Sequence, residues 1–256
     1  MTGSGGEATR PSFWLQMLES RALPELGAYA GLYPLLYMAP KGDGHPVLVL
    51  PGFLTTGAAT FPLRHFLNIL GYRGHRWKLG RNLGPVGYKE FEILQRLKDL
   101  RHRYGKKVSV IGWSLGGLYA RELAWMAPED VRMVITLGTP FRYHDSTTVS
   151  WLYEDLTGQE EARMPAEFRE RLDLPPPVPS TAIYSRTDGV VPWRCSLERT
   201  AEFAENIRVE SSHCGLGHNP AVLWAIADRL AQPEGQWRPF TRQGLRRLFY
   251  FSPDCL

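Results

Sequence analysis

The hexapeptide Gly112-Trp113-Ser114-Leu115-Gly116-Gly117 constrains this chain more than any other feature, because it lies between two apolar runs. The run before it, 108–111, has the length of a buried strand, and the run after it, 118–126, has helical spacing. A G-x-S-x-G sequence at a strand-to-helix junction predicts a very sharp turn in which the serine adopts a strained backbone conformation. Ser114 is therefore the candidate nucleophile. The alternative is a glycine-rich turn whose exposed serine has no function.

Apolar runs and helical segments alternate along most of the chain. Runs that predict strands occupy residues 47–50, 74–78, 108–111, 131–137, 181–185 and 207–210. Helical patterns lie between them, at residues 61–70, 88–104, 118–126 and 220–231. This alternation predicts a doubly wound α/β fold, with a mainly parallel sheet of about six strands and helices on both faces.

The remaining segments predict one domain with an insertion. Residues 1–12 are small and polar and predict a disordered leader, followed by a single domain over 13–256. Residues 141–179 mix aromatic residues with acids and arginines and end in a proline run, which indicates a cap inserted over the sheet. This cap would form either an apolar lid or a simple shield. The apolar run 32–38 would face a membrane or partner, or pack in the core, and we favour packing.

Composition narrows the possible partners. The chain has 256 residues and a net charge of +4, without the basic stripe interleaved with aromatics that a nucleic acid requires, so we expect no nucleic-acid partner. Arginines at 242, 246 and 247 allow at most a weak peripheral contact with anionic lipid. The three cysteines are widely spaced and predict no disulfide framework, metal site or cofactor.

With no apolar signal segment and no membrane-length run, we expect a cytoplasmic location. The oligomeric state stays open.

A serine nucleophile needs a histidine base and a carboxylate that orients this base. After a nucleophile elbow, the acid and the histidine follow in that order, on loops at the carboxyl ends of later strands. Asp188 follows the strand expected at 181–185 and is the preferred acid, although an Asp-Gly pair can also be simple turn chemistry. Asp145 and Asp155 lie in the insertion and are weaker candidates.

Two histidines compete for the role of base in the loop before the last helix. His213 is closer to the end of the preceding strand, whereas His218 stands next to the expected helix cap Asn219. We favour His213 and keep His218 as the alternative base. The other histidines do not fit the expected order: His45, His65, His75, His102 and His144.

The oxyanion hole requires two backbone N–H groups directed at the developing negative charge. Leu115 follows the nucleophile and provides one of them. The second is expected from Phe53, with Leu54 as the next choice, because the loop after the first strand reads Pro51-Gly52-Phe53-Leu54 and proline has no N–H. The substrate pocket is expected to include Gly52, Leu54, Trp113 and Trp151.

These pieces together resemble the α/β-hydrolases, in particular the compact bacterial lipases and esterases. The resemblance is carried by residues 47–53, 112–117, 137–140, 181–192 and 213–216, and it covers most of residues 45–231. It implies hydrolysis of a small-molecule or lipid ester through an acyl-serine intermediate, with Ser114, Asp188 and His213 as the triad. One departure is that many lipases have His-Gly where this chain has Pro51-Gly52. Thioesterases, amidases and acyltransferases use the same triad, and a non-catalytic binding protein can keep the fold.

Overall fold

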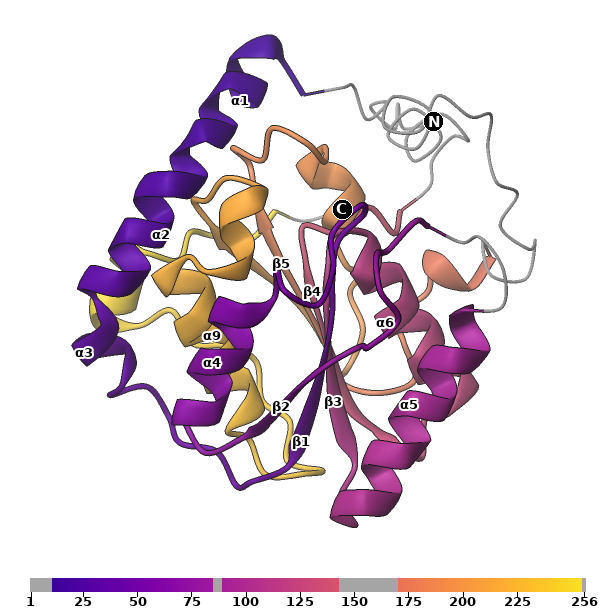
Figure 1. Cartoon of the computed structure of the whole chain (residues 1–256). Coiled ribbons are helices and arrows are strands. Elements are labelled where there is room, and N and C mark those ends of the chain that lie inside the picture. Colours follow the sequence, from indigo (N-terminus) through magenta and orange to yellow (C-terminus); the bar gives the residue numbers. More distant parts are fainter. Residues whose placement is uncertain (1–10, 85–88, 143–169, 255–256) are drawn as a thin grey trace.

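A single parallel sheet forms the centre of the molecule (Figure 1). The computed structural model describes residues 11–84, 89–142 and 170–254. The sheet has six strands in the order β2-β1-β3-β4-β5-β6, and every adjacent pair is parallel. The strands are β1 (Pro46–Leu50), β2 (Arg73–Arg76), β3 (Val108–Trp113), β4 (Val131–Leu137), β5 (Ser180–Ser185) and β6 (Ala204–Val209). The expected parallel α/β sheet of about six strands is confirmed.

Helices cover both faces of the sheet because the side chains of each strand alternate between two cores. Val47 and Val49 of β1 pack in the core that contains α4 (Phe61–Ile69) and α9 (Pro220–Leu230). Leu48 and Leu50 pack in the opposite core, with α5 (Lys89–Tyr104) and α6 (Leu115–Met126). All four side chains are fully buried, and each contributes about 1.5–3 kcal/mol to folding. The continuous apolar runs of the sequence are thus strands buried on both sides.

Most elements differ from their expected bounds by one or more residues, and three of these differences have a clear physical reason. β2 begins and ends earlier than 74–78, and it is the edge strand of the sheet, with its first and last residues exposed. β6 begins three residues before the apolar run at 207–210, because its first residues pair with β5 although their side chains are only half-buried. α6 begins at Leu115, inside the glycine-rich motif, because Gly116 and Gly117 are helical here despite their low helix propensity.

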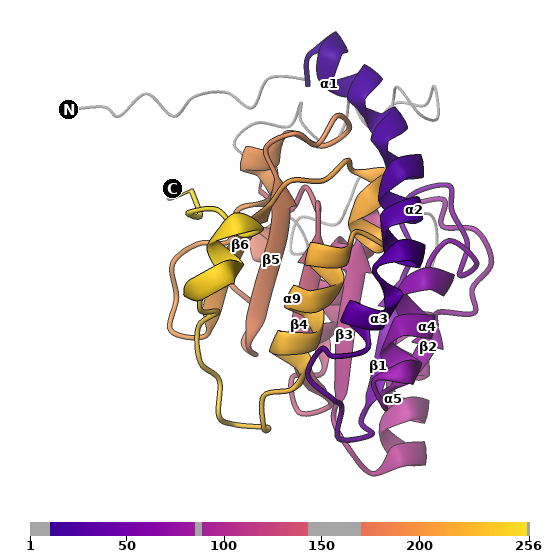
Figure 2. The ribbon, with the colours of Figure 1, turned by 90° about the vertical axis from the view of Figure 1, so that its left-hand side faces the viewer.

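Four short helices at the amino end form an arm, residues 13–36, along one side of the α4/α9 layer (Figures 1 and 2). They are α1 (Phe13–Met17), the 3-10 helix η1 (Leu18–Arg21), α2 (Ala22–Gly31) and α3 (Tyr33–Leu36). The expectation that the run 32–38 packs in the core is wrong for most of the run. Leu36 is buried, whereas Leu32, Leu35, Tyr37 and Met38 are exposed, because the one-turn helix α3 directs a single face toward α9.

The expected leader and most of the expected insertion lie outside the described residues, including 1–10, Trp151, Asp145 and Asp155. At the ends of the insertion, Phe141 and Leu172 are buried in a small cluster with Leu118. In the described part of the chain, no helix has the length and apolar character needed to cross a membrane.

Candidate active site

Ser114 lies in the turn between β3 and α6 with a strained backbone. Its φ of 51° and ψ of −125° fall in a region that residues with side chains rarely adopt. Three hydrogen bonds hold this conformation. The Ser114 N–H donates to the carbonyl of Leu137 at 2.8 Å, and the Ser114 carbonyl accepts from the Gly117 N–H and the Thr139 hydroxyl, both at 2.9 Å. Strain that is fixed by its surroundings is a feature of functional sites.

The two glycines of the motif are required by close packing. A Cβ on Gly112 would lie 2.3 Å from the backbone of Gly117, and a Cβ on Gly116 would lie 2.5 Å from the carbonyl oxygen of Leu50. Both distances are far below van der Waals contact. The sequence motif therefore reports the turn that the structure contains, and the elbow geometry expected around Ser114 is present.

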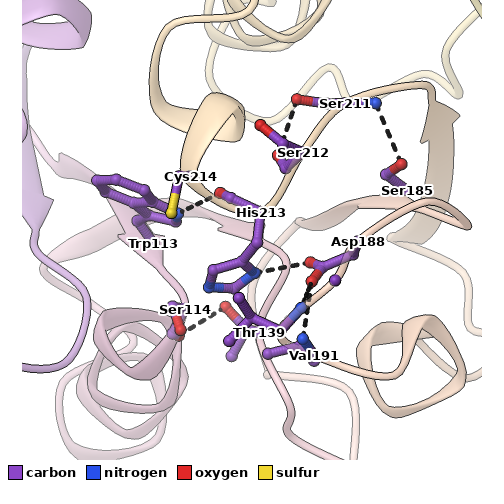
Figure 3. A network of polar contacts seen from close by, with 12 residues as sticks. Trp113, Ser114, Thr139, Ser185, Asp188, Val191, Ser211, Ser212, His213 and Cys214 are labelled. Atoms are coloured by element: carbon purple, nitrogen blue, oxygen red, sulfur yellow. Dashed lines mark hydrogen bonds and ion pairs between the residues drawn. The ribbon is translucent and has the colours of Figure 1, made fainter. Parts of the chain in front are cut away.

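Asp188 lies in the loop between β5 and the 3-10 helix η2 (Trp193–Ser196), and it is almost completely buried. One carboxylate oxygen accepts hydrogen bonds from the backbone N–H groups of Val190 and Val191, at 2.8 and 2.7 Å. The other oxygen lies 2.7 Å from Nδ1 of His213 (Figure 3). The backbone bonds fix the carboxylate, so its second oxygen is directed at the histidine.

The His213 ring lies between Asp188 and Ser114, with its second ring nitrogen on the Ser114 side (Figure 3). Burial lowers the pKa of His213, but the charge of Asp188, the hydrogen bond to Asp188 and the charge of Glu19 together raise this pKa above its ordinary value. A buried imidazole next to a fixed carboxylate is a stronger base than free imidazole. The arrangement can therefore accept a proton from a hydroxyl placed at the second nitrogen.

The structure brings His213, and not His218, to Asp188. The Nε2 atom of His218 lies 2.9 Å from the carbonyl oxygen of Ala22, so this ring is bonded to the amino-terminal arm.

Trp113, which we expected in the substrate pocket, donates its indole N–H to the carbonyl of His213 at 3.1 Å. Trp113 thus supports the loop that carries the candidate base.

The loop after β1 lies against the elbow. A Cβ on Gly52 would lie 3.3 Å from the Cβ of Ser114, which is a tight contact, so the glycine keeps the space beside the serine open. Phe53 packs against the cluster that contains Leu115. Because β1 and β3 are neighbours whose connections leave in opposite directions along the sheet, the two expected oxyanion donors stand at the switch point of the topology.

Asn82 holds this loop in place. Its backbone carbonyl accepts the Leu54 N–H at 2.7 Å, and its side-chain amide donates to the carbonyl of Pro51 at 2.8 Å. Leu54 has a φ of 57°, which this bond helps to maintain. The Leu54 N–H is therefore already bonded within this loop, which counts against Leu54 as an oxyanion donor.

Sequence reasoning missed Asn82, Glu19 and Glu25. Asn82 is fully buried in a glycine-rich loop, and the two glutamates of the arm accept hydrogen bonds from the loops that carry Asp188 and His213. The only signal in the sequence was that acids stand between apolar residues of short helices, which is common on solvent-facing surfaces. Within the described ranges, no group of three His, Cys, Asp or Glu side chains is arranged to hold a metal ion.

Comparison with known proteins supports the fold more strongly than the activity. No protein-family model matches the chain. The pimeloyl-[acyl-carrier protein] methyl ester esterase of Aliivibrio fischeri is 29% identical over 110 residues, which are 42% of this chain and 42% of that enzyme. The chain thus matches less than half of the length of this curated relative.

Solved lipases have the same fold. Lipase B of Aspergillus fumigatus superposes with a TM-score of 0.57 and 17% identity, over 75% of this chain and 54% of that one. The mature lipase BlEst2 of Bacillus licheniformis superposes with a TM-score of 0.56 and 17% identity, over 76% of this chain and 94% of that one. Together with the parallel sheet and the strained serine turn, these matches show that the chain has the α/β-hydrolase fold.

Proposed function

We propose that this protein is a serine hydrolase that cleaves carboxylic esters through an acyl-serine intermediate. The observation that carries the proposal is the 2.7 Å contact between Asp188 and His213, on the side of the ring away from the strained Ser114. An acid, a base and a hydroxyl in this order are the parts that activate a serine. The fold shared with esterases and lipases is consistent with this proposal.

The proposed reaction has two halves. In the first, His213 Nε2 takes the proton of the Ser114 hydroxyl while the serine oxygen attacks the ester carbonyl. The resulting oxyanion accepts hydrogen bonds from the backbone N–H groups of Leu115 and Phe53. The protonated His213 then gives its proton to the departing alcohol, which leaves an acyl-Ser114. In the second half, His213 takes a proton from water, the hydroxide attacks the acyl group, and the proton returns to Ser114 as the acid is released.

Thioesters, amides and acyl transfer to an acceptor other than water are the alternative chemistries, since the same residues serve all of them. The methyl ester in the name of the curated relative favours an ester, and so methyl esters belong in the first substrate panel. The apolar contacts of Phe53, Leu115 and Phe141 favour an apolar acyl group. We also propose that Gly52, Leu54, Trp113 and Trp151 contact the substrate.

Labelling with a fluorophosphonate probe tests the nucleophile directly. The wild type is expected to be labelled on Ser114, and Ser114→Ala is expected to lose labelling. Absence of labelling in the wild type, or equal labelling of the variant, would leave only a binding protein of this fold.

A panel of p-nitrophenyl esters of increasing acyl length, with matched methyl esters, thioesters and amides, tests the substrate class. Ester turnover above that of the amides by several orders of magnitude supports the proposal.

His213→Ala and His218→Ala, assayed on the preferred ester, identify the base: only the first is expected to abolish turnover. Loss of activity in the second variant alone would transfer the role to His218.

A further inference from the structure

The carboxylate of Glu19 joins the two loops that carry Asp188 and His213. Glu19 lies on η1 of the amino-terminal arm, and its Oε1 accepts the backbone N–H groups of Gly189 and His213, both at 2.8 Å. Its Oε2 accepts the N–H of Cys214 at 3.0 Å. Gly189 directly follows Asp188 in the chain. One side chain therefore bonds to both of the loops that carry the candidate acid and base.

Bonds of this kind are strong enough to fix the relative position of the two loops. Hydrogen bonds to a carboxylate are shorter and roughly twice as strong as those between neutral groups. The arm also packs tightly here, since a Cβ on Gly189 would lie 2.2 Å from the carbonyl oxygen of Leu15. The contact between Asp188 and His213 joins side chains from two separate loops, so its length depends on how these loops sit relative to one another.

The other charged residues of the arm each bond to one loop only. Glu25 accepts from the Ser211 hydroxyl and from the backbone and hydroxyl of Ser212, all in the His213 loop. Arg21 donates to the carbonyl of Thr187, in the Asp188 loop. Among the three charged side chains of residues 13–36, Glu19 is the one that bonds to both loops.

We propose that Glu19 is a positioning residue for the proposed hydrolase reaction, which holds the Asp188 and His213 loops in the register that catalysis requires. The proposal rests on the function proposed above. A displacement of about 1 Å at such a site is enough to slow catalysis about 100-fold. Removal of the Glu19 carboxylate should therefore affect kcat much more than KM, because Glu19 bonds to the triad loops and not to the pocket residues.

The charge of Glu19 also gives this role a signature in the pH profile. The ionisable groups near His213 are Asp188 on the loop after β5, Glu19 and Glu25 on the arm, and Cys214 on the loop of His213 itself. Arg21 bonds beside Asp188. Burial lowers the pKa of His213, while Asp188 and Glu19 raise it. Loss of the Glu19 charge should therefore shift the acid limb of kcat/KM to lower pH.

The test compares Glu19→Gln, Glu19→Asp and the matched control Glu25→Gln in the full chain. For Glu19→Gln we expect kcat on the preferred p-nitrophenyl ester to fall 10- to 100-fold, KM to change less than threefold, and the acid limb to move to lower pH. Glu19→Asp keeps the charge and should retain the position of the acid limb, with a smaller loss of kcat. Glu25→Gln contacts only one loop and should lose less than fivefold in kcat.

Equal kinetics in Glu19→Gln and Glu25→Gln, or an effect on KM alone, would overturn the proposal. If Glu19→Gln does not fold, Glu19→Asp decides, since an unchanged kcat in that variant contradicts a positioning role. If the wild type cleaves no substrate, the proposed function fails separately. NMR titration of the His213 ring then tests Glu19 without activity: a lower His213 pKa in Glu19→Gln supports the contact, and an unchanged pKa overturns it.

Discussion

The protein contains two Ser-His-Asp arrangements, one at each end of the central strand β3. Ser114, His213 and Asp188 gather where β3 ends, and Ser109, His45 and Asp43 gather near its start. In the second arrangement the contacts are complete: His45 Nδ1 lies 2.5 Å from Asp43, and His45 Nε2 lies 2.8 Å from the Ser109 hydroxyl. Judged by these hydrogen bonds alone, the arrangement around Ser109 would be the better candidate for a catalytic triad.

Access and backbone conformation separate the two serines. Ser109 has no exposed surface and lies within β3, paired with β1 and β4 just after a register shift between Val108 and Ser109. Ser114 retains 5% exposure and a backbone strained at φ 51°. Of the two serines, only Ser114 therefore has surface that a substrate could reach.

Electrostatics separates the two histidines. Arg132 lies 3.1 Å from Nδ1 of His45 and also pairs with Asp43 at 2.7 Å. Burial and then the Arg132 charge lower the pKa of His45 to about 4, although Asp43 opposes them. For His213 burial is the largest effect and lowers the pKa, but the charge of Asp188, the hydrogen bond to Asp188 and the charge of Glu19 together raise it above its ordinary value. The comparison teaches that the charge around the base, together with access, distinguishes a candidate catalytic triad from a structural one.

Substitution of the two serines by alanine gives the largest expected difference. Ser114→Ala should lower kcat for ester hydrolysis by roughly 10⁶-fold, the scale of losing a triad nucleophile. Ser109→Ala should keep kcat within a few-fold but lower the free energy of unfolding by about 1–2 kcal/mol, because His45 Nε2 loses its buried partner. Steady-state kinetics and urea denaturation of both variants measure this. A comparable loss of kcat in Ser109→Ala would mean that the second arrangement takes part in the chemistry.

The two aspartates should differ by a smaller factor. Asp188→Asn should reduce kcat about 10⁴-fold, because an amide no longer holds His213 in the tautomer that accepts a proton from Ser114. Asp43→Asn should leave kcat within a few-fold and lower the unfolding free energy by about 1 kcal/mol, since Asp43 is half-exposed. The same assays decide. A fall in kcat for Asp43→Asn that persists below the melting transition would contradict the assignment.

The two histidines should titrate on opposite sides of the ordinary pKa of 6.5. His213 is expected to titrate above this value, so that the acid limb of kcat/KM lies above pH 6.5, and His45 near pH 4. NMR titration of the ring protons, assigned with His45→Gln and His213→Gln, measures both pKa values. A His45 resonance that titrates near pH 6.5 would show that Arg132 does not act as described.

The same shifts have opposite consequences for stability. The unfolded chain binds a proton at His45 below about pH 6.5, whereas the native chain does so only near pH 4. The unfolding free energy should therefore fall as the pH drops from 6.5 to 4, and it should fall less steeply in His45→Gln. The raised pKa of His213 stabilises the fold below pH 6.5, and this contribution is lost as the pH rises through the native pKa.

The sequence predicted those parts of the molecule that depend on local patterns. The motif around Ser114 and the alternation of apolar runs with helices predicted the elbow and the parallel sheet, because glycine spacing and buried strands leave direct marks in a sequence. The roles of Asp188 and His213 remain predictions, but the two residues are in contact as expected. Contacts between distant segments leave no such mark. Glu19 lies 194 positions from His213, and Asn82 lies 31 from Pro51, so neither could be predicted. Nothing in the sequence indicated the arrangement around Ser109 either.

The smallest expected difference concerns backbone strain at the two serines. Ser114→Gly removes the Cβ that is disfavoured at φ 51°, which releases about 1–3 kcal/mol, while the added freedom of the unfolded chain costs about 0.5–1 kcal/mol. The net expectation is a gain of about 1 kcal/mol. Ser114→Ala keeps the Cβ and should change stability little, so the difference between the two variants reports the strain. Ser109→Gly, within β3, should instead lose about 2 kcal/mol, because it loses both a strand side chain and a buried hydrogen bond. Urea midpoints at constant slope measure all three. Equal midpoints for Ser114→Gly and Ser114→Ala would mean that the elbow stores no strain, and the two serines would then differ only in access and in the charge around their histidines.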